Sequence, residues 1–159
     1  MKLSNKGRYA VRALFDIAYF NDNQPTQVKD ISLRQSIPSR FLEQIFQELK
    51  RAGLVTAKRG PKGGYTLAQS PQSIRLGDVV RAVEGPIELG HASGEKTTKT
   101  PGNGKPTRDS LRVMDDLFKD LSGHVEACFD AVSVMDICER AQTLGVRKPG
   151  TGQKYAYVI

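Results

Sequence analysis

The strongest constraint on the fold is an unbroken order of three amphipathic segments followed by two short strand patterns around a glycine-rich tip, all within residues 4–67. The first segment can be capped by Ser4 or Asn5, and its apolar residues then recur every three or four positions as far as the NDNQPT turn. This spacing predicts an amphipathic helix that buries one face.

A short second helix and a longer third helix are predicted next. Thr26 is the expected cap of the second helix, and Pro38 ends it because the residue before a proline disfavours helical backbone. The third helix is expected from Ser39 to Ala52, with Gly53 directly after its end. One face of this helix is apolar, through Leu42, Ile45, Phe46 and Leu49.

Residues 54–58 and 65–67 read as two strands joined by the tip RGPKGG, and a fourth helix with apolar residues follows Ser73. Three helices followed by such a hairpin are the order of a winged helix-turn-helix. The predicted fold class is therefore mainly α with a small β-hairpin wing, in a DNA-binding domain of residues 1–84.

The rest of the chain predicts a linker, a long helix and a tail. Residues 85–106 are rich in Gly, Pro, Thr, Lys and Ser, which favours a flexible loop. Within residues 107–144, apolar positions alternate at three and four in a seam, and such a seam beyond a linker favours pairing with a second copy of the chain. Its members are Leu111, Met114, Phe118, Leu121, Val125, Cys128 and Val132. Ser133 is expected to cap a last short helix, and residues 145–159 to be a disordered tail.

The distribution of charge favours a nucleic acid as partner. The net charge of the chain is +7 at pH 7. Residues 1–85 hold 14 Lys and Arg against 7 Asp and Glu, whereas residues 86–159 hold 10 of each, so the whole excess lies with the predicted DNA-binding domain. Charge that serves only to keep the surface solvated would give the same total without this difference between the two halves of the chain.

Other classes of protein are disfavoured. No stretch approaches the roughly 20 apolar residues that cross a bilayer, and the first residues lack a signal peptide's apolar run, so we expect a cytoplasmic protein without membrane contact. No catalytic triad pattern, phosphate-binding loop or paired metal motif is present in the sequence, which argues against an enzyme. Two cysteines are too few for a disulfide framework.

The candidate DNA-reading residues lie on the third helix and at the wing. Long or small polar side chains that reach base edges are expected on the outward face of the third helix, and an arginine on the glycine-rich tip suits the minor groove. The predicted base contacts are Ser39, Arg40, Glu43, Gln44 and Arg59, and the predicted phosphate contacts are Lys6, Arg8, Tyr9, Lys62, Gly63 and Gly64. For Tyr9, burial in the core is an alternative that the sequence favours as much as contact with phosphate.

The segments SNKGRYAVRAL, IPSRFLEQIF, GLV and RGPKGGYTL resemble the Rrf2 family of bacterial transcription regulators. The resemblance covers about residues 1 to 141 and is strongest through the wing. It implies a homodimer with two winged domains joined by crossed long helices, reading a pseudo-palindromic operator, most often as a repressor. In the family, the residues that match Ser39, Arg40, Glu43, Gln44 and Arg59 contact DNA.

The resemblance breaks down in the loop before the long helix. Cluster-binding members of the family carry three cysteines there, since thiolates usually hold an iron-sulfur cluster. This chain has no cysteine between Gly85 and Arg108, and Ala92 stands where the first ligand would be. A Cys-to-Ala replacement would explain Ala92 alone, but Thr97, Thr98 and Asn103 do not resemble such replacements. We therefore predict no cofactor and a naturally cluster-free member.

The signal that controls such a protein stays open at this point. His91 is a candidate metal or cluster ligand, although a single loop histidine is more often solvated. Cys128 and Cys138 are candidates for a redox role, against the commoner use of buried cysteine as a small apolar residue. The alternative is control by a metabolic enzyme as protein partner, which resembles the cluster-free cysteine-metabolism member of the family.

Overall fold

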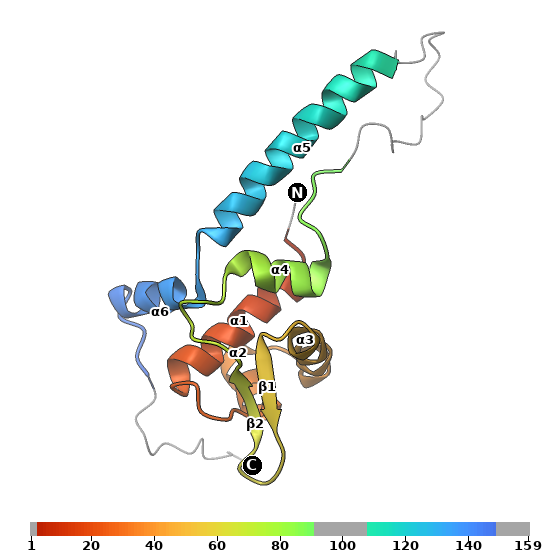
Figure 1. Cartoon of the computed structure of the whole chain (residues 1–159). Helices are drawn as coiled ribbons and strands as arrows, with labels where there is room; N and C mark the ends of the chain where they lie inside the picture. Colours follow the sequence, from red (N-terminus) through yellow and green to blue (C-terminus); the bar gives the residue numbers. More distant parts are fainter. Residues whose placement is uncertain (1–2, 91–107, 149–159) are drawn as a thin grey trace.

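The computed structural model of the protein describes residues 3–90 and 108–148. A body of short helices and a hairpin carries one long helix that projects from it (Figure 1). The elements follow in the order α1 (Asn5–Phe20), α2 (Val28–Gln35), α3 (Ser39–Arg51), β1 (Val55–Lys58), β2 (Gly64–Leu67), α4 (Leu76–Glu84), α5 (Arg108–Asp130) and α6 (Val134–Thr143). The predicted class, mainly α with a small hairpin, is confirmed. In the described ranges, no helix combines the length and apolar character needed to span a membrane.

Helix α1 is the centre of the body, because it packs against α2, α3, α4 and α6. It begins after Ser4, as predicted, and the Ser4 hydroxyl accepts from the Gly7 backbone N–H at 3.2 Å. The carboxylate of Glu84, at the end of α4, accepts from the Ser4 hydroxyl at 2.6 Å and from the Gly7 N–H at 3.1 Å. Backbone donors that a helix start leaves unpaired are thereby satisfied, and the end of α4 is fixed to the start of α1.

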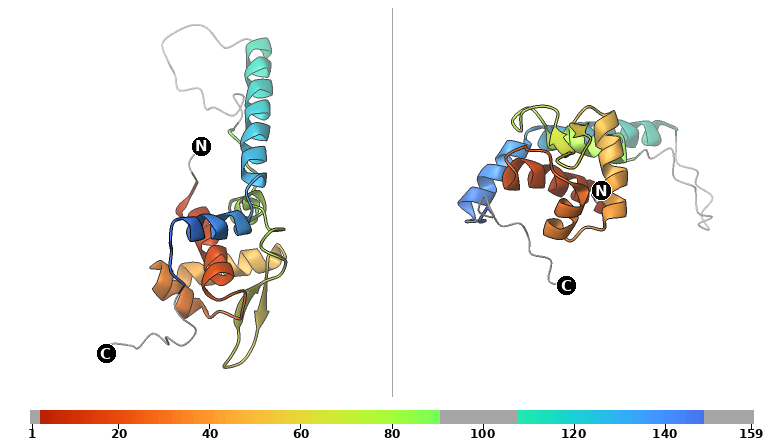
Figure 2. Two further views of the ribbon diagram at one scale, coloured as in Figure 1. Left: turned by 90° about the vertical axis from the view of Figure 1, so that its left-hand side faces the viewer. Right: turned by 90° about the horizontal axis from the view of Figure 1, so that it is seen from below.

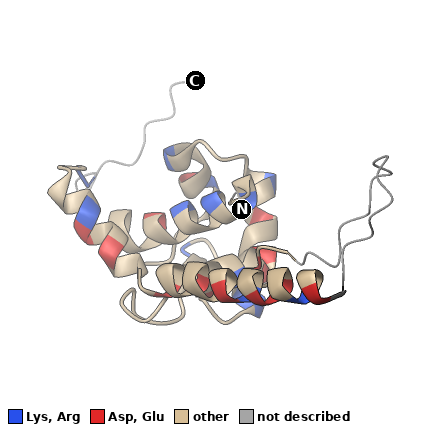
Figure 3. Ribbon diagram, turned by 90° about the horizontal axis from the view of Figure 1, so that it is seen from above, with Lys and Arg blue, Asp and Glu red and all other residues tan. Residues whose placement is uncertain are grey.

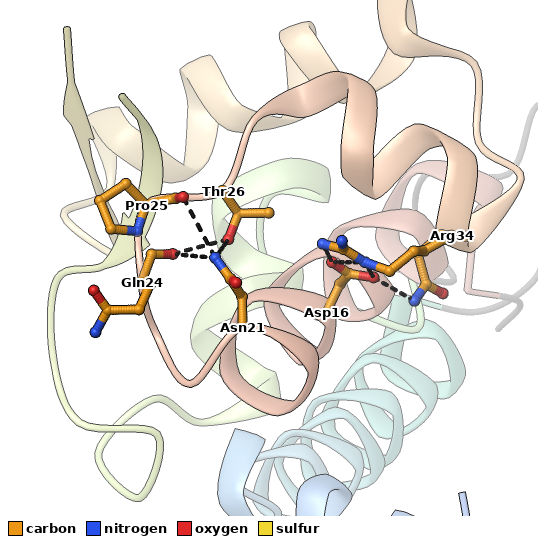
Figure 4. Close-up of polar contacts among 7 residues, drawn as sticks. Asp16, Asn21, Gln24, Pro25, Thr26 and Arg34 are labelled. Atoms are coloured by element: carbon orange, nitrogen blue, oxygen red, sulfur yellow. Dashed lines mark hydrogen bonds and ion pairs between the residues drawn. The ribbon is translucent and has the colours of Figure 1, made fainter. Parts of the chain in front are cut away.

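A buried ion pair joins α1 to α2. Asp16 is fully buried in α1, and the Arg34 Nε of α2 donates to its two carboxylate oxygens at 3.0 and 3.1 Å (Figure 4). The Gln35 side-chain amide donates to the same carboxylate at 2.8 Å. The chain then leaves α2 through Ser36, which has left-handed backbone, and α3 begins at Ser39 as predicted.

Thr26 does not cap α2, contrary to the prediction. The N-cap of α2 is Gln27, which makes no side-chain capping bond. Thr26 instead exchanges two backbone hydrogen bonds with Tyr65 of β2, at 3.0 and 2.8 Å. Its hydroxyl donates to the Gln24 carbonyl and accepts from the Asn21 amide, so it belongs to the turn after α1 (Figure 4). Thr26 therefore adds a third, one-residue strand to the hairpin.

The hairpin is antiparallel, with Val55 opposite Leu67 and Lys58 opposite Gly64. Val55 and Leu67 are buried at the end of the hairpin nearer the helices. The tip between the strands extends to the end of the molecule opposite α5 (Figure 1).

Arg81 of α4 connects the body to the long helix. Its guanidinium donates to Glu126 and Asp130 of α5 at 2.7 and 2.8 Å, and to Asp78 of α4 at 2.9 Å. These carboxylates, Asp130 foremost, raise the pKa of Arg81 above its ordinary value. A Cβ atom at Gly77 would lie 1.7 Å from a carboxylate oxygen of Asp130, so glycine leaves the room for this contact. From this joint α5 extends away from the body (Figure 2).

At the C-terminal end of the chain, one helix end differs from the prediction and one helix cap agrees with it. Helix α5 ends at Asp130, so Val132 lies outside the expected seam, and its carbonyl accepts from the Leu76 N–H at 2.9 Å where the chain turns toward α6. Ser133 caps α6 as predicted: its hydroxyl accepts from the Asp136 N–H, and the Asp136 carboxylate accepts from the Ser133 N–H at 2.7 Å. The Ser133 hydroxyl also donates to this carboxylate at 2.6 Å, and this bond, together with that from the Ser133 N–H, lowers the pKa of the Asp136 carboxyl.

The expectation of a disordered tail from Gly145 does not hold for residues 145–148. The Tyr19 hydroxyl donates to the Val146 carbonyl at 2.7 Å, and the Lys148 ammonium pairs with Asp22 at 2.7 Å. This part of the tail is held against the end of α1 because both contacts are with that region. Residues 149–159, the rest of the expected tail, lie outside the described residues.

Replacing Asp16 with Asn is expected to lower the free energy of unfolding by about 3 kcal/mol, because the largely buried Arg34 would lose its counter-charge. Urea denaturation followed by circular dichroism measures this change. The matched control is Asp22→Asn, which removes an ion pair whose carboxylate side chain is 70% exposed and should change stability little. Equal effects of the two substitutions would contradict the assigned role of Asp16.

Candidate nucleic-acid-binding surface

The outward face of α3 carries the side chains that sequence reasoning assigned to base edges. Leu42, Ile45, Phe46 and Leu49 are buried as predicted, so the residues between them turn outward. Helix α3 lies along the edge of the body opposite α6 (Figure 2). The exposed polar residues at its beginning are Ser39, Arg40, Glu43 and Gln44.

The tip of the hairpin presents two exposed cations, Arg59 and Lys62. Gly63 does not offer its backbone amide to a ligand, contrary to the prediction, because this N–H donates to the Gly60 carbonyl at 2.9 Å. Gly63 is buried, and a Cβ there would lie 2.2 Å from the Lys58 carbonyl oxygen. Gly64 has φ +145, and a Cβ there would lie 2.4 Å from the Thr26 carbonyl oxygen. Both glycines are needed for the tight shape of the wing.

Two contacts fix the wing relative to the helices. The Tyr65 ring of β2 stacks on the Phe46 ring of α3, with centroids 4.3 Å apart and planes 11° apart. The Gln27 side chain, at the start of α2, donates to the Pro61 carbonyl in the tip at 3.1 Å. The polar face of α3 and the cationic tip are therefore parts of one rigid surface.

The predicted phosphate contacts at the start of α1 already have partners within the chain. The Lys6 ammonium forms an ion pair with Glu48 of α3 at 2.7 Å. Arg8 is exposed and donates to the Asn5 side chain at 2.6 Å. Tyr9 is half-buried, and its ring meets the Phe41 ring edge-on. Its burial is therefore intermediate between that of a core residue and that of a surface residue that contacts phosphate.

Helix α5 exposes an apolar stripe that overlaps the predicted seam only in part. Met114 and Leu121 of the seam are 41% exposed each, and Cys128 is also exposed. Leu111, Phe118 and Val125 of the seam are half-buried. Val113 and Leu117, which the prediction omitted, are 61% and 46% exposed. The solvent-facing stripe consists of Val113, Met114, Leu117, Leu121 and Cys128. Several acidic residues are distributed along α5 (Figure 3).

Comparison with known proteins decides the family. A model of the Rrf2 family, described as an iron-dependent transcriptional regulator, matches residues 3–140. The chain belongs to the Rrf2 family. An HTH-type transcriptional regulator IscR of Vibrio campbellii (strain ATCC BAA-1116) is 34% identical over 146 residues, which are 92% of this chain and 82% of the relative. The IscR of Vibrio vulnificus (strain YJ016) is 38% identical over 125 residues, which are 79% of this chain and 70% of the relative.

Solved structures of Rrf2 proteins show the same architecture. The T. potens IscR structure superposes with a TM-score of 0.67 at 29% identity, over 94% of each chain. CymR (YrzC), the global cysteine regulator of B. subtilis, superposes with a TM-score of 0.65 at 27% identity, over 88% of this chain and 98% of CymR. The prediction of a winged-helix transcription regulator that is not an enzyme is confirmed by these relatives.

The cysteines of this Rrf2 protein do not fit an iron-sulfur cluster. The whole chain has two cysteines, and Cys138 is buried in the core, where burial raises the pKa of its thiol. Cys128 is on the exposed stripe of α5. Among the described residues no three His, Cys, Asp or Glu side chains are grouped so that they could hold a metal ion. His91 and Ala92 lie outside the described residues.

Several residues that shape this surface were missed from the sequence. Glu84 and Asp16 act through partners 80 and 18 positions away in the chain, and no local pattern marks such contacts. Leu117 did carry a signal, since it lies four residues before Leu121 of the predicted seam on α5. The alternating seam favoured Phe118 in place of Leu117, because periodicity alone does not show which side of a helix the rest of the chain covers.

Proposed function

We propose that this Rrf2 regulator binds operator DNA as a homodimer, with α3 in the major groove and the wing beside it. The observation that carries the proposal is the fixed pairing of the polar face of α3 with the cationic wing tip through the stacked rings of Phe46 and Tyr65. A rigid surface of this kind meets base edges and the neighbouring backbone at the same time. A dimer seated on an operator blocks access to the promoter, so repression is the action we propose.

The roles of the reading residues follow from their donors and acceptors. The Arg40 guanidinium suits the O6 and N7 acceptors of guanine, and the Gln44 amide suits the N6 and N7 of adenine. Glu43 accepts from the N4 amino group of cytosine, and the Ser39 hydroxyl bonds to a base or a phosphate. At the tip, we assign Arg59 to the minor groove and Lys62 to phosphate.

Phosphate binding at the start of α1 is proposed for Arg8, which is exposed. Lys6 is assigned differently from the sequence prediction, because its ion pair with Glu48 already uses its charge. We assign the glycines of the wing to its shape and its cations to its contacts with DNA.

Replacing Gln44 with Ala should weaken discrimination at one base pair of each half-site by about 1–3 kcal/mol, because a bidentate contact to one base is lost. Arg59→Ala should likewise relax sequence preference, whereas Lys62→Ala should weaken binding to all sequences and make its salt dependence less steep. Fluorescence anisotropy with duplexes selected from a random library measures these effects. Gln142→Ala, at an exposed position of α6, is the matched control. A uniform loss on all duplexes would make Gln44 a phosphate anchor.

Dimerisation through α5 is supported by the exposed stripe. Val113, Met114, Leu117 and Leu121 lie on adjacent turns of a helix that projects from the body, so a second copy can cover them without disturbing the winged domain (Figure 1). Two copies paired in this way place their recognition helices at a fixed separation, which suits a pseudo-palindromic operator.

Leu117→Glu should convert the dimer to a monomer and reduce operator affinity, because it places a charge in the apolar contact between the two long helices. Sedimentation equilibrium measures the change in mass, and anisotropy measures the affinity. Leu144→Glu is the matched control, because Leu144 is 74% exposed at the end of α6, away from the stripe. A dimer that persists in the Leu117 variant would exclude this face of α5 as the interface.

We propose further that this regulator works without an iron-sulfur cluster, since its cysteines do not supply the thiolates that such a cluster needs. Protein purified under anaerobic conditions should be colourless and should contain no stoichiometric iron or sulfide. Visible absorption and metal analysis of one sample test this. A charge-transfer band with stoichiometric iron would contradict the proposal and would make Cys128 and His91 the first residues to replace.

A further inference from the structure

One exposed residue of the α3 face is apolar. Along α3, which is described throughout, the other exposed side chains are polar or charged, whereas the Phe41 side chain is 52% exposed. It lies three residues before Gln44, so the two side chains are neighbours on the helix surface. Both line a groove of about 410 Å³ between α3 and the start of α1.

The Phe41 ring is held in its outward position from one side only. The Tyr9 ring of α1 meets it edge-on, with centroids 6.5 Å apart and planes at 68°. The Arg12 guanidinium lies 5.8 Å from the centroid of the Tyr9 ring. Arg12 in turn donates to the side chain and backbone carbonyl of Gln35 in α2. Two helices therefore support the back of this aromatic pair and leave the front of Phe41 free.

We propose that Phe41 recognises the C5 methyl group of a thymine next to the base that Gln44 reads. The inference rests on the proposed placement of α3 in the major groove. The base-edge group there that an apolar side chain can recognise is the thymine methyl, because the other groups are hydrogen-bond donors and acceptors. Phe41 lies at the border of the polar face, on the side toward α1, so its ring faces the base next to the one that Gln44 reads.

Deoxyuridine provides a probe that removes only this methyl group. Wild-type protein is first used to select binding duplexes from a random library, and each thymine of the selected half-site is then replaced in turn by deoxyuridine. Replacement at one position should weaken binding about fourfold per half-site, as expected for one methyl group no longer buried. The other positions should bind thymine and uracil equally well.

The protein variants assign that position to Phe41. Phe41→Ala should bind the thymine and uracil duplexes with equal affinity, and Phe41→Leu should keep part of the preference because its side chain stays apolar. Leu144→Ala, which shortens another exposed apolar residue, should keep the whole preference. Thermal melting of each variant shows that it is folded.

Each failure has its own meaning. If no deoxyuridine position weakens wild-type binding, or if Phe41→Ala keeps the preference for thymine, Phe41 does not read the methyl group and its exposed ring contacts the sugar-phosphate backbone instead. If no duplex is selected from the library, the proposed DNA-binding function is wrong, and the role of Phe41 that rests on it is wrong as well.

Discussion

The buried carboxylate of Asp16 is the interaction on which the rest of the DNA-facing architecture depends. It fixes α2 to the central helix, and the short turn after α2 then sets where α3 begins. Burying a charge is costly unless hydrogen bonds satisfy it, and Arg34 with Gln35 supply those bonds. A well-packed apolar pair at the same place would hold two helices together with less directional precision. The ion pair thus fixes the orientation of the helix-turn-helix as well as its stability.

Helix α4 carries the mechanical link between the long helix and the DNA-facing end of the body. At its C-terminal end, Glu84 receives the first backbone donors of α1. Arg81, also in α4, donates hydrogen bonds to two carboxylates of α5. A change in the direction of α5 would therefore displace the start of α1, because α4 is hydrogen-bonded to both helices. In the proposed dimer, the geometry of the paired long helices and the position of α3 are therefore coupled through charge-assisted hydrogen bonds, which are more directional than apolar packing.

The features that could be predicted from the sequence are those that local chemistry decides. The bounds of α3 and the caps at Ser4 and Ser133 depend on residues within a few positions, and they were correct. Thr26 was misassigned because its pairing with Tyr65 spans 39 residues, and a threonine before a helical pattern looks like a cap. Gly63 looked open to phosphate because a sequence does not show that the turn itself uses the amide. On α5, the predicted seam includes the half-buried Phe118 and omits the exposed Leu117, because periodicity does not show how the rest of the chain covers a helix.

The charge arrangement of the reading surface separates affinity from selectivity. At the beginning of α3 the positive charge of Arg40 is three residues from the negative charge of Glu43, and Lys6 is paired with Glu48, so this part of the surface attracts the DNA polyanion only weakly. We assign the main attraction for DNA phosphates to exposed cations around this part of the surface, Arg59 and Lys62 on the wing and Arg8 at the start of α1. A carboxylate at the beginning of α3 is repelled by base acceptors and by phosphates unless a cytosine amino group faces it. In the proposed complex, incorrect sequences are therefore rejected at the beginning of α3 even though the surrounding cations bind them, and correct sequences gain contacts that these cations alone do not provide.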